Sequence, residues 1–225
     1  LIDKQEVTEI RYVLDLTNVN HDDILELLKT SSKNEYVEVT NETLCLFDIS
    51  SYEDVEYQTL IIQCCGRIYK SKSLSNKLLT DFANKFNSFH ETTRYVAYTL
   101  NYKQKIPYVI GNKGFIPSDG YSKQTVSWVA LDNIKRVTED SNTYQVHLIS
   151  IRNFVLILPM SKFVFEQQLN RTARILKRKK VLLNGVLTAY VQTLNNSQMK
   201  KRNILLNEMD VVAFEYPNLT YKSML

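Results

Sequence analysis

Hydrophobic and polar residues alternate in several short runs of this 225-residue chain, and in other stretches apolar residues recur every three to four positions. A period of two is typical of β-strands, and the longer period is typical of helices with one apolar face. The alternating runs are also rich in β-branched and aromatic residues, which favour strands. They predict strands at 6–14, 36–40, 43–49, 57–69, 92–102, 125–137, 143–150 and 152–159.

Helical spacing predicts three main helices. The first covers 21–30, with Asn20 as its N-cap and acidic residues in its first turn. The second covers 74–89 after Ser73, and the third runs from Ser161 to about Lys180, before the Asn184-Gly185 dipeptide. Further helical stretches at 186–194 and 199–209 and a strand at 211–217 would complete the chain.

The order of the elements indicates an α+β fold with a mainly antiparallel sheet and a few packed helices. Its most regular part is a strand-strand-strand-helix unit at 126–180, preceded by a loop at 103–120 that is rich in glycine and proline. We expect three parts: an acidic N-terminal extension at 1–34, an α+β domain at 35–180 and a divergent tail at 181–225.

Charge is distributed unevenly along the chain. The formal net charge is +4, but residues 1–60 hold 4 Lys/Arg and 14 Asp/Glu, whereas residues 61–225 hold 24 Lys/Arg and 10 Asp/Glu. This asymmetry favours a part that binds a polyanion, next to an acidic part with another role. Three cysteines, two of them adjacent, suggest buried thiols in a reducing compartment. Together with the lack of a long apolar run, they predict a cytoplasmic protein.

Motifs for catalysis are missing from the sequence. It contains no glycine-rich phosphate-binding loop, no GxSxG turn and no HExxH helix, and its three histidines are far apart. We therefore expect no enzymatic activity, no metal and no cofactor.

Two basic segments are candidates for nucleic-acid contact. On a helix, Arg171, Arg174 and Arg178 share one face, and the helix dipole accounts for only part of the positive charge that follows them. Phosphates would relieve the repulsion between neighbouring cations, although a solvated face is the alternative. The loop after residue 102 interleaves lysines with tyrosines, which suits backbone contact or stacking, or is an ordinary solvated loop. The candidate DNA-binding residues are Arg171, Arg174, Lys177, Arg178, Lys179, Lys180, Lys103, Lys105 and Lys113.

The run from Lys103 to Leu176 resembles the ComK family of competence transcription factors. Four pieces carry the likeness in the same order: KIPYVI, FIPS, SWVALDNIKRV and FVLILPMSKFVFEQQLNRTARIL. The fit extends over about residues 36–180. Where the family often has a Cys-aromatic-Gly segment, this chain has SFHETTRYVAY.

The resemblance implies a transcriptional activator that binds AT-rich double-stranded DNA through the minor groove as a homo-oligomer. It also implies control by proteolysis, because Phe214–Pro217 (FEYP) is similar to a peptide by which some members bind a proteolytic adaptor. The alternative is a protein-protein interaction module that regulates another transcription factor or a proteolytic adaptor without binding DNA. The acidic first 60 residues suit that alternative, or could cover the basic face of the same chain.

Overall fold

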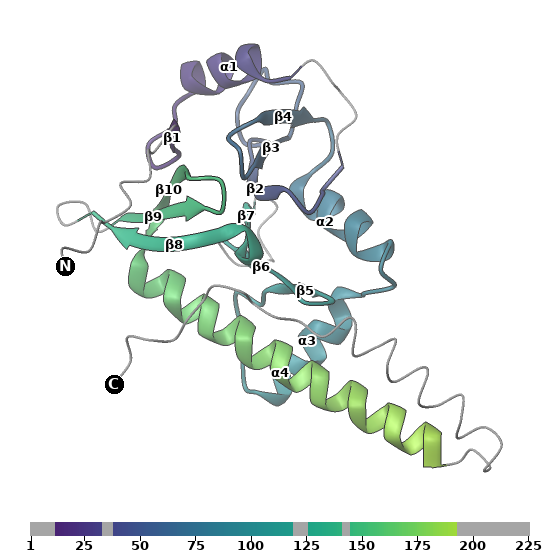
Figure 1. Cartoon of the computed structure of the whole chain (residues 1–225). Helices are drawn as coiled ribbons and strands as arrows, with labels where there is room; N and C mark the ends of the chain where they lie inside the picture. Colours follow the sequence, from purple (N-terminus) through teal and green to yellow (C-terminus); the bar gives the residue numbers. More distant parts are fainter. Residues whose placement is uncertain (1–11, 33–37, 119–125, 141–144, 193–225) are drawn as a thin grey trace, which may run out of the picture.

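The computed structural model describes residues 12–32, 38–118, 126–140 and 145–192 (Figure 1). Within them lie four α-helices and ten strands, so the predicted α+β class is confirmed. The helices are α1 (His21–Thr30), α2 (Ser75–Asn84), α3 (His90–Thr99) and α4 (Lys162–Gln192). The strands are β1 (Tyr12–Asp15), β2 (Thr43–Asp48), β3 (Thr59–Gln63), β4 (Ile68–Ser71), β5 (Tyr108–Ile110), β6 (Lys113–Pro117), β7 (Trp128–Ala130), β8 (Ile134–Glu139), β9 (Gln145–Ser150) and β10 (Phe154–Ser161).

The strands form two sheets. The smaller has the order β1-β10-β9-β8 and the larger has the order β4-β3-β2-β7-β6-β5. All neighbouring strands are antiparallel except β1, which runs parallel to β10. The 3₁₀ turn Leu131–Asn133 carries the chain from β7 in the larger sheet to β8 in the smaller one. Asn133 fixes this turn, because its Nδ2 donates to the carbonyl oxygens of Asn41 and Thr43 at 2.8 Å each.

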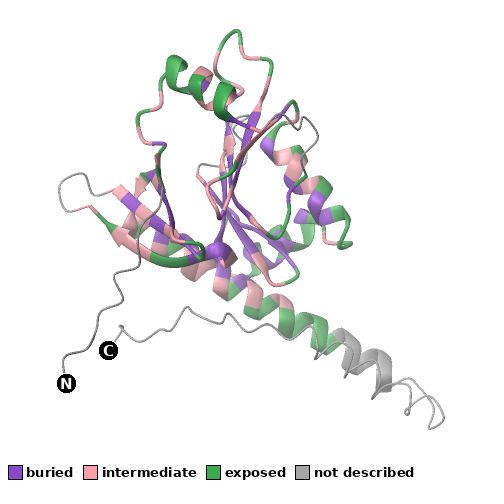
Figure 2. Ribbon diagram, turned by 45° about the horizontal axis from the view of Figure 1, so that its top comes forward, coloured by how far each residue is buried: buried purple, intermediate pink, exposed green. Residues whose placement is uncertain are grey.

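The main hydrophobic core lies between the two sheets (Figure 2). Buried side chains of β2, β3 and β7 meet those of β9, β10 and the start of α4, where Phe165 is 1% exposed. A second core lies where α2 packs against the larger sheet, around the fully buried Trp128. The Trp128 Nε1 donates to Asn76 Oδ1 at 2.8 Å, which satisfies the polar atom of the indole.

All three cysteines are free thiols, and Cys45 and Cys64 are buried. The Cys64 thiol donates to Glu42 Oε2 at 2.9 Å, and Glu42 also pairs with Arg152 at 2.8 Å. Burial raises the pKa of Cys45 and of Cys64 to about 12, with the Glu42 hydrogen bond contributing to the shift at Cys64.

Most predicted strands are present, with corrections at their ends. The run 57–69 is not one strand but two, β3 and β4, joined by a turn at which Gly66 has φ of 83°. Residues 38–40 of the predicted strand 36–40 do not pair with another strand, because hydrogen bonds between Thr40 and Thr43 close a turn that leads into β2. Pro159 does not end β10; it lies where the pairing with β9 shifts register, so its missing N–H costs no ladder bond.

The predicted N-cap of α1 is confirmed, and that of α2 is wrong. Asn20 caps α1 as predicted, with a reciprocal pair of hydrogen bonds to Asp23. Ser73 does not cap α2, whose N-cap is Leu74 without a side-chain bond. Ser75, the first residue of α2, is instead buried and donates to Val126 O at 2.5 Å, which attaches the helix to the chain before β7.

Candidate nucleic-acid interface

Helix α4 begins where the sequence predicts and packs one face on the sheets. Ser161 accepts a hydrogen bond from Val164 N at 3.3 Å, as an N-cap does. Phe165, Thr172 and Ile175 recur at helical spacing and are 1%, 0% and 0% exposed. Because this face is fixed against the body, the opposite face of α4 presents its cations outward.

The helix is longer than predicted. It does not end near Lys180 at the Asn184-Gly185 dipeptide but continues to Gln192, beyond the body of the molecule (Figure 1). A glycine inside a helix costs only about 1 kcal/mol relative to alanine, and no proline follows it within the helix. The residue range predicted for the divergent tail therefore starts inside α4.

Helix α3 replaces the strand that the sequence predicts at 92–102. Its threonines, tyrosines and valine favour strands as isolated residues, but Thr93, Val96 and Ala97 are buried at helical spacing. Val96 and Ala97 belong to the same hydrophobic cluster as Ile175 of α4. Tertiary packing here outweighs intrinsic propensity. The helix ends at Thr99, and Asn101, two residues later, reverses the chain with a φ of 63°.

This helix end places the next residue, Tyr102, against α4. The N–H of Tyr102 donates to Ala97 O and that of Asn101 to Tyr98 O, both at 2.9 Å, which is the hydrogen-bond pair of a Schellman motif. Asparagine tolerates the left-handed conformation that this motif requires better than most residues. An asparagine after apolar residues spaced by three and four is the sequence signal that could have identified α3.

The two predicted candidate segments meet at Tyr102. The guanidinium carbon of Arg171 lies 5.0 Å from the Tyr102 ring centre, and Arg171 Nη1 donates to Gln104 O at 2.7 Å. Arg174 Nη1 donates to the Tyr102 hydroxyl at 3.4 Å. The loop and the basic helix thus form one surface, and Lys103 lies exposed between the two contacting loop residues.

Lys105 and Lys113 lie differently from the arginines of α4. Lys105 is half-buried with φ of 47°, and its Nζ donates to Ser118 O at 3.4 Å. Lys113 is half-buried at the start of β6. The pKa of Glu42 is lowered first by the hydrogen bond from Cys64, and Lys113 contributes less to that shift. The charge of Lys113 also opposes the rise in the pKa of Asp132. Burial is the larger influence on Asp132 and raises the pKa of that carboxyl to about 6. Lys113 therefore has acidic neighbours rather than the cations of the helix.

The ammonium group of Lys179 makes its hydrogen bonds inside the molecule. Its Nζ donates to Val109 O at 2.9 Å and to Thr93 Oγ1 at 3.3 Å. Burial lowers the pKa of Lys179 to about 8. These bonds join α4 to both α3 and β5, so the residue positions its neighbours on the helix, a role that the run of four cations did not reveal.

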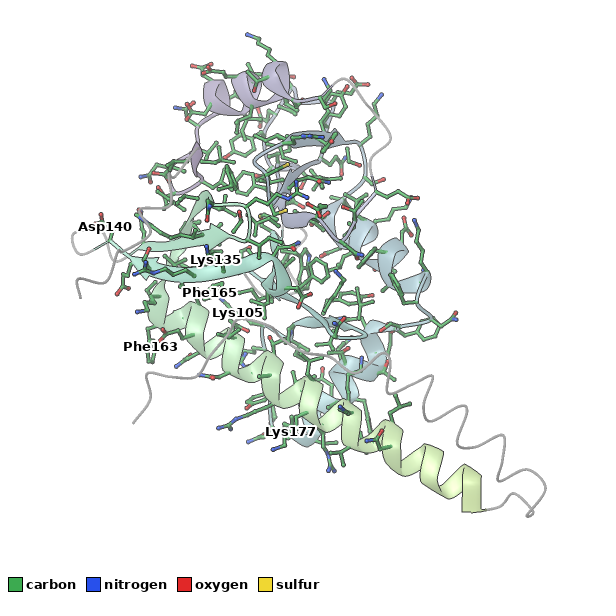
Figure 3. All side chains as sticks on the ribbon, viewed as in Figure 1. Lys105, Lys135, Asp140, Phe163, Phe165 and Lys177 are labelled. Carbon is green, nitrogen blue, oxygen red and sulfur yellow. The ribbon has the colours of Figure 1, made fainter. Side chains whose placement is uncertain are left out.

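The remaining cations form what we call the basic face, made of Lys103, Arg174, Lys177, Arg178 and Lys180, all exposed. Lys177 is labelled in Figure 3 near the middle of α4. The single acidic residue of α4 is Glu166, one turn into the helix and 3.8 Å from Lys162. The basic face therefore has no carboxylate of its own helix to neutralise it.

Acidic side chains gather at the opposite end of the described molecule. Asp22, Asp23 and Glu26 are exposed on α1, which lies at the top of Figure 1, whereas α4 crosses the bottom. The described part of the acidic segment therefore does not cover the basic face. The predicted adaptor peptide Phe214–Pro217 lies outside the described residues.

The fold is that of an α+β protein with an exposed basic surface, and the sequence comparison gives the family. The family model described as ComK protein matches residues 33–180. The chain belongs to the ComK family, a family of competence transcription factors, and its role is in the regulation of transcription. Searches of curated proteins and of solved structures found no match. In the part of the chain that the structure describes, no helix is long and apolar enough to span a bilayer.

Proposed function

We propose that this chain regulates transcription by binding AT-rich double-stranded DNA as an oligomer, with the basic face as its principal contact. The observation that carries the proposal is the exposed set of cations on α4, joined by Lys103 from a loop about 70 residues earlier and free of carboxylates from α4. Membership in a family of transcription factors supports it.

The physical basis is the charge of the phosphate backbone. Each neutralised phosphate releases counterions and contributes about −0.9 to the slope of log affinity against log salt concentration. Arginine also enters the narrow minor groove of AT tracts, where the negative potential is strongest. Arg174 and Arg178 are the arginines of the basic face; Arg174 donates to the Tyr102 hydroxyl, and Arg178 lies one turn further along α4.

The test is an anisotropy titration of AT-rich and GC-rich duplexes at several salt concentrations. The double variant Arg174→Glu/Arg178→Glu should lose binding to all sequences and have a shallower salt dependence. The matched control is Lys29→Glu/Lys77→Glu, which changes the net charge equally at exposed positions on α1 and α2 and should retain binding. Equal losses in both double variants would mean that net charge alone attracts DNA.

Sedimentation of the protein with and without duplex tests the oligomer. If the wild type binds no duplex at low salt, the proposal that this chain binds DNA is wrong. A protein partner that survives nuclease treatment would then support the protein-protein interaction module instead.

A further inference from the structure

Helix α3 displays an aromatic surface next to the basic half of α4. The side chains of Tyr95 and Tyr98 are 67% and 48% exposed, three residues apart and therefore on one face of the helix. The opposite face of α3 is buried against Ile175 and Val109. Exposed tyrosines are not required by the packing of this helix, so their exposure needs another reason.

Two arginines accompany these rings. Arg94 Nη2 donates to the Tyr98 hydroxyl at 3.0 Å, and the guanidinium carbon lies 5.8 Å from the ring centre, so the contact is toward the hydroxyl end of the ring. One turn later, Tyr102 receives Arg171 on its ring and Arg174 at its hydroxyl. Tyr95, Tyr98 and Tyr102 thus lead along α3 toward the basic face, and we call these three residues the tyrosine row.

The charge around the tyrosine row suits a polyanion. Glu91 is the only acidic residue of α3, and the described part of α4 contributes no acid on the side of Arg174 and Arg178. Lys179 holds α3 and α4 together through Thr93, so the rings and the cations keep a fixed arrangement. Aromatic side chains that alternate with cations in this way are the usual means of binding single-stranded nucleic acid, because every base can stack on a ring.

We propose that the tyrosine row binds unpaired bases of single-stranded DNA, with the phosphates of the same strand on the basic face. This proposal rests on the proposed contact between α4 and phosphates, and adds a second form of DNA as a ligand. AT-rich duplex, with its easily unstacked TA steps, is the sequence class in which unpaired bases form at the lowest cost. The chain would then hold both the duplex and a locally opened strand.

The test is fluorescence anisotropy with a labelled oligothymidine of about 15 nucleotides, the length that such sites cover, and with a blunt AT-rich duplex hairpin. Tyr95→Ala/Tyr98→Ala should weaken binding to the single strand by about 5- to 150-fold for each base that loses its stacking partner. Tyr95→Phe/Tyr98→Phe, which keeps the rings, should bind the single strand nearly as well as the wild type. Affinity for the duplex should change less than twofold in both.

The matched control is Phe163→Ala. Phe163 is 66% exposed and lies at the other end of α4, away from Lys177 (Figure 3). It should leave binding to both DNA forms unchanged. Circular dichroism melts of all variants should coincide with the wild type, because the substituted side chains are exposed.

Each other outcome overturns the proposal in a distinguishable way. A wild type that binds the duplex but not the single strand removes the tyrosine row as a base-binding site and leaves the proposed function intact. Equal loss on the single strand and the duplex would assign the tyrosines to general DNA contact. Unchanged DNA binding together with altered self-association in the alanine variant would identify a protein interface instead.

Discussion

Gly114 in β6 lies where the larger sheet approaches α4 closely. A Cβ built on this glycine would lie 2.6 Å from Thr172 Cγ2 and 3.3 Å from Leu131 Cδ1. Since carbon atoms in contact are about 3.5–4.0 Å apart, Gly114→Ala forces α4 to move outward by roughly 1 Å or the strand to bend. Overpacking of this kind costs about 1–3 kcal/mol. We expect the unfolding free energy to fall by that amount and the Tm to fall by about 2–4 °C for each kcal/mol.

Urea unfolding followed by circular dichroism measures the change, and two further variants isolate its cause. Thr172→Ser removes Cγ2 but keeps the hydroxyl that donates to Gln168 O at 2.7 Å, so alone it should cost about 0.8 kcal/mol. Combined with Gly114→Ala it should recover about 1 kcal/mol or more of the loss, because the clash is gone. Gly185→Ala, where the new Cβ meets nothing within 4 Å, should stabilise the helix by about 0.5–1 kcal/mol. Strictly additive effects of the two core substitutions would refute this account of the contact.

Three further expectations concern buried titratable groups. Burial lowers the pKa of Lys179 from 10.5 to about 8, so the unfolded chain binds more protons than the folded chain between these pH values. The stability of the wild type, measured by urea unfolding, should therefore rise with pH over that range relative to Lys179→Met. Burial likewise lowers the pKa of His90 to about 4 from 6.5, so the wild type should lose stability as the pH falls through that range, and His90→Phe, which keeps the stacking on Tyr108, should lose less. In a thiol titration near pH 8 the half-buried Cys65 should react first, and Cys45 and Cys64 only after unfolding; rapid reaction of all three in the native protein would contradict their burial.

The sequence predicted elements well where local pattern and tertiary environment agree. The strands around Trp128 and Phe154 are almost continuously apolar because they are buried along most of their length. Asn20 caps α1 through hydrogen bonds with Asp23, three positions away. It failed at α3, where β-branched and aromatic residues favour a strand and only burial against Ile175 selects a helix. The sequence prediction also ended α4 too early, because one glycine inside a helix costs too little free energy to end it.

The sequence predicted the candidate site as two separate segments, but it could not predict that they contact each other. Arg171 and Gln104 are 67 residues apart, and nothing local to either indicates a hydrogen bond between them. Lys179 has the same neighbours in sequence as the exposed cations, yet the orientation of α4 directs its ammonium group toward Val109. Which cations of a basic run face solvent depends on helix packing, which is a property of the whole fold.

Strand β1 has a practical consequence for anyone preparing a shortened form of this protein. The family match begins at residue 33, but Tyr12–Asp15 pairs with β10 and forms one edge of the smaller sheet. A fragment cut at the start of the family match would leave the β10 edge unpaired, and unpaired edges promote aggregation. The shortest fragment that we expect to remain monodisperse therefore begins before Tyr12, and loss of DNA binding in a shorter one would report misfolding rather than a missing contact.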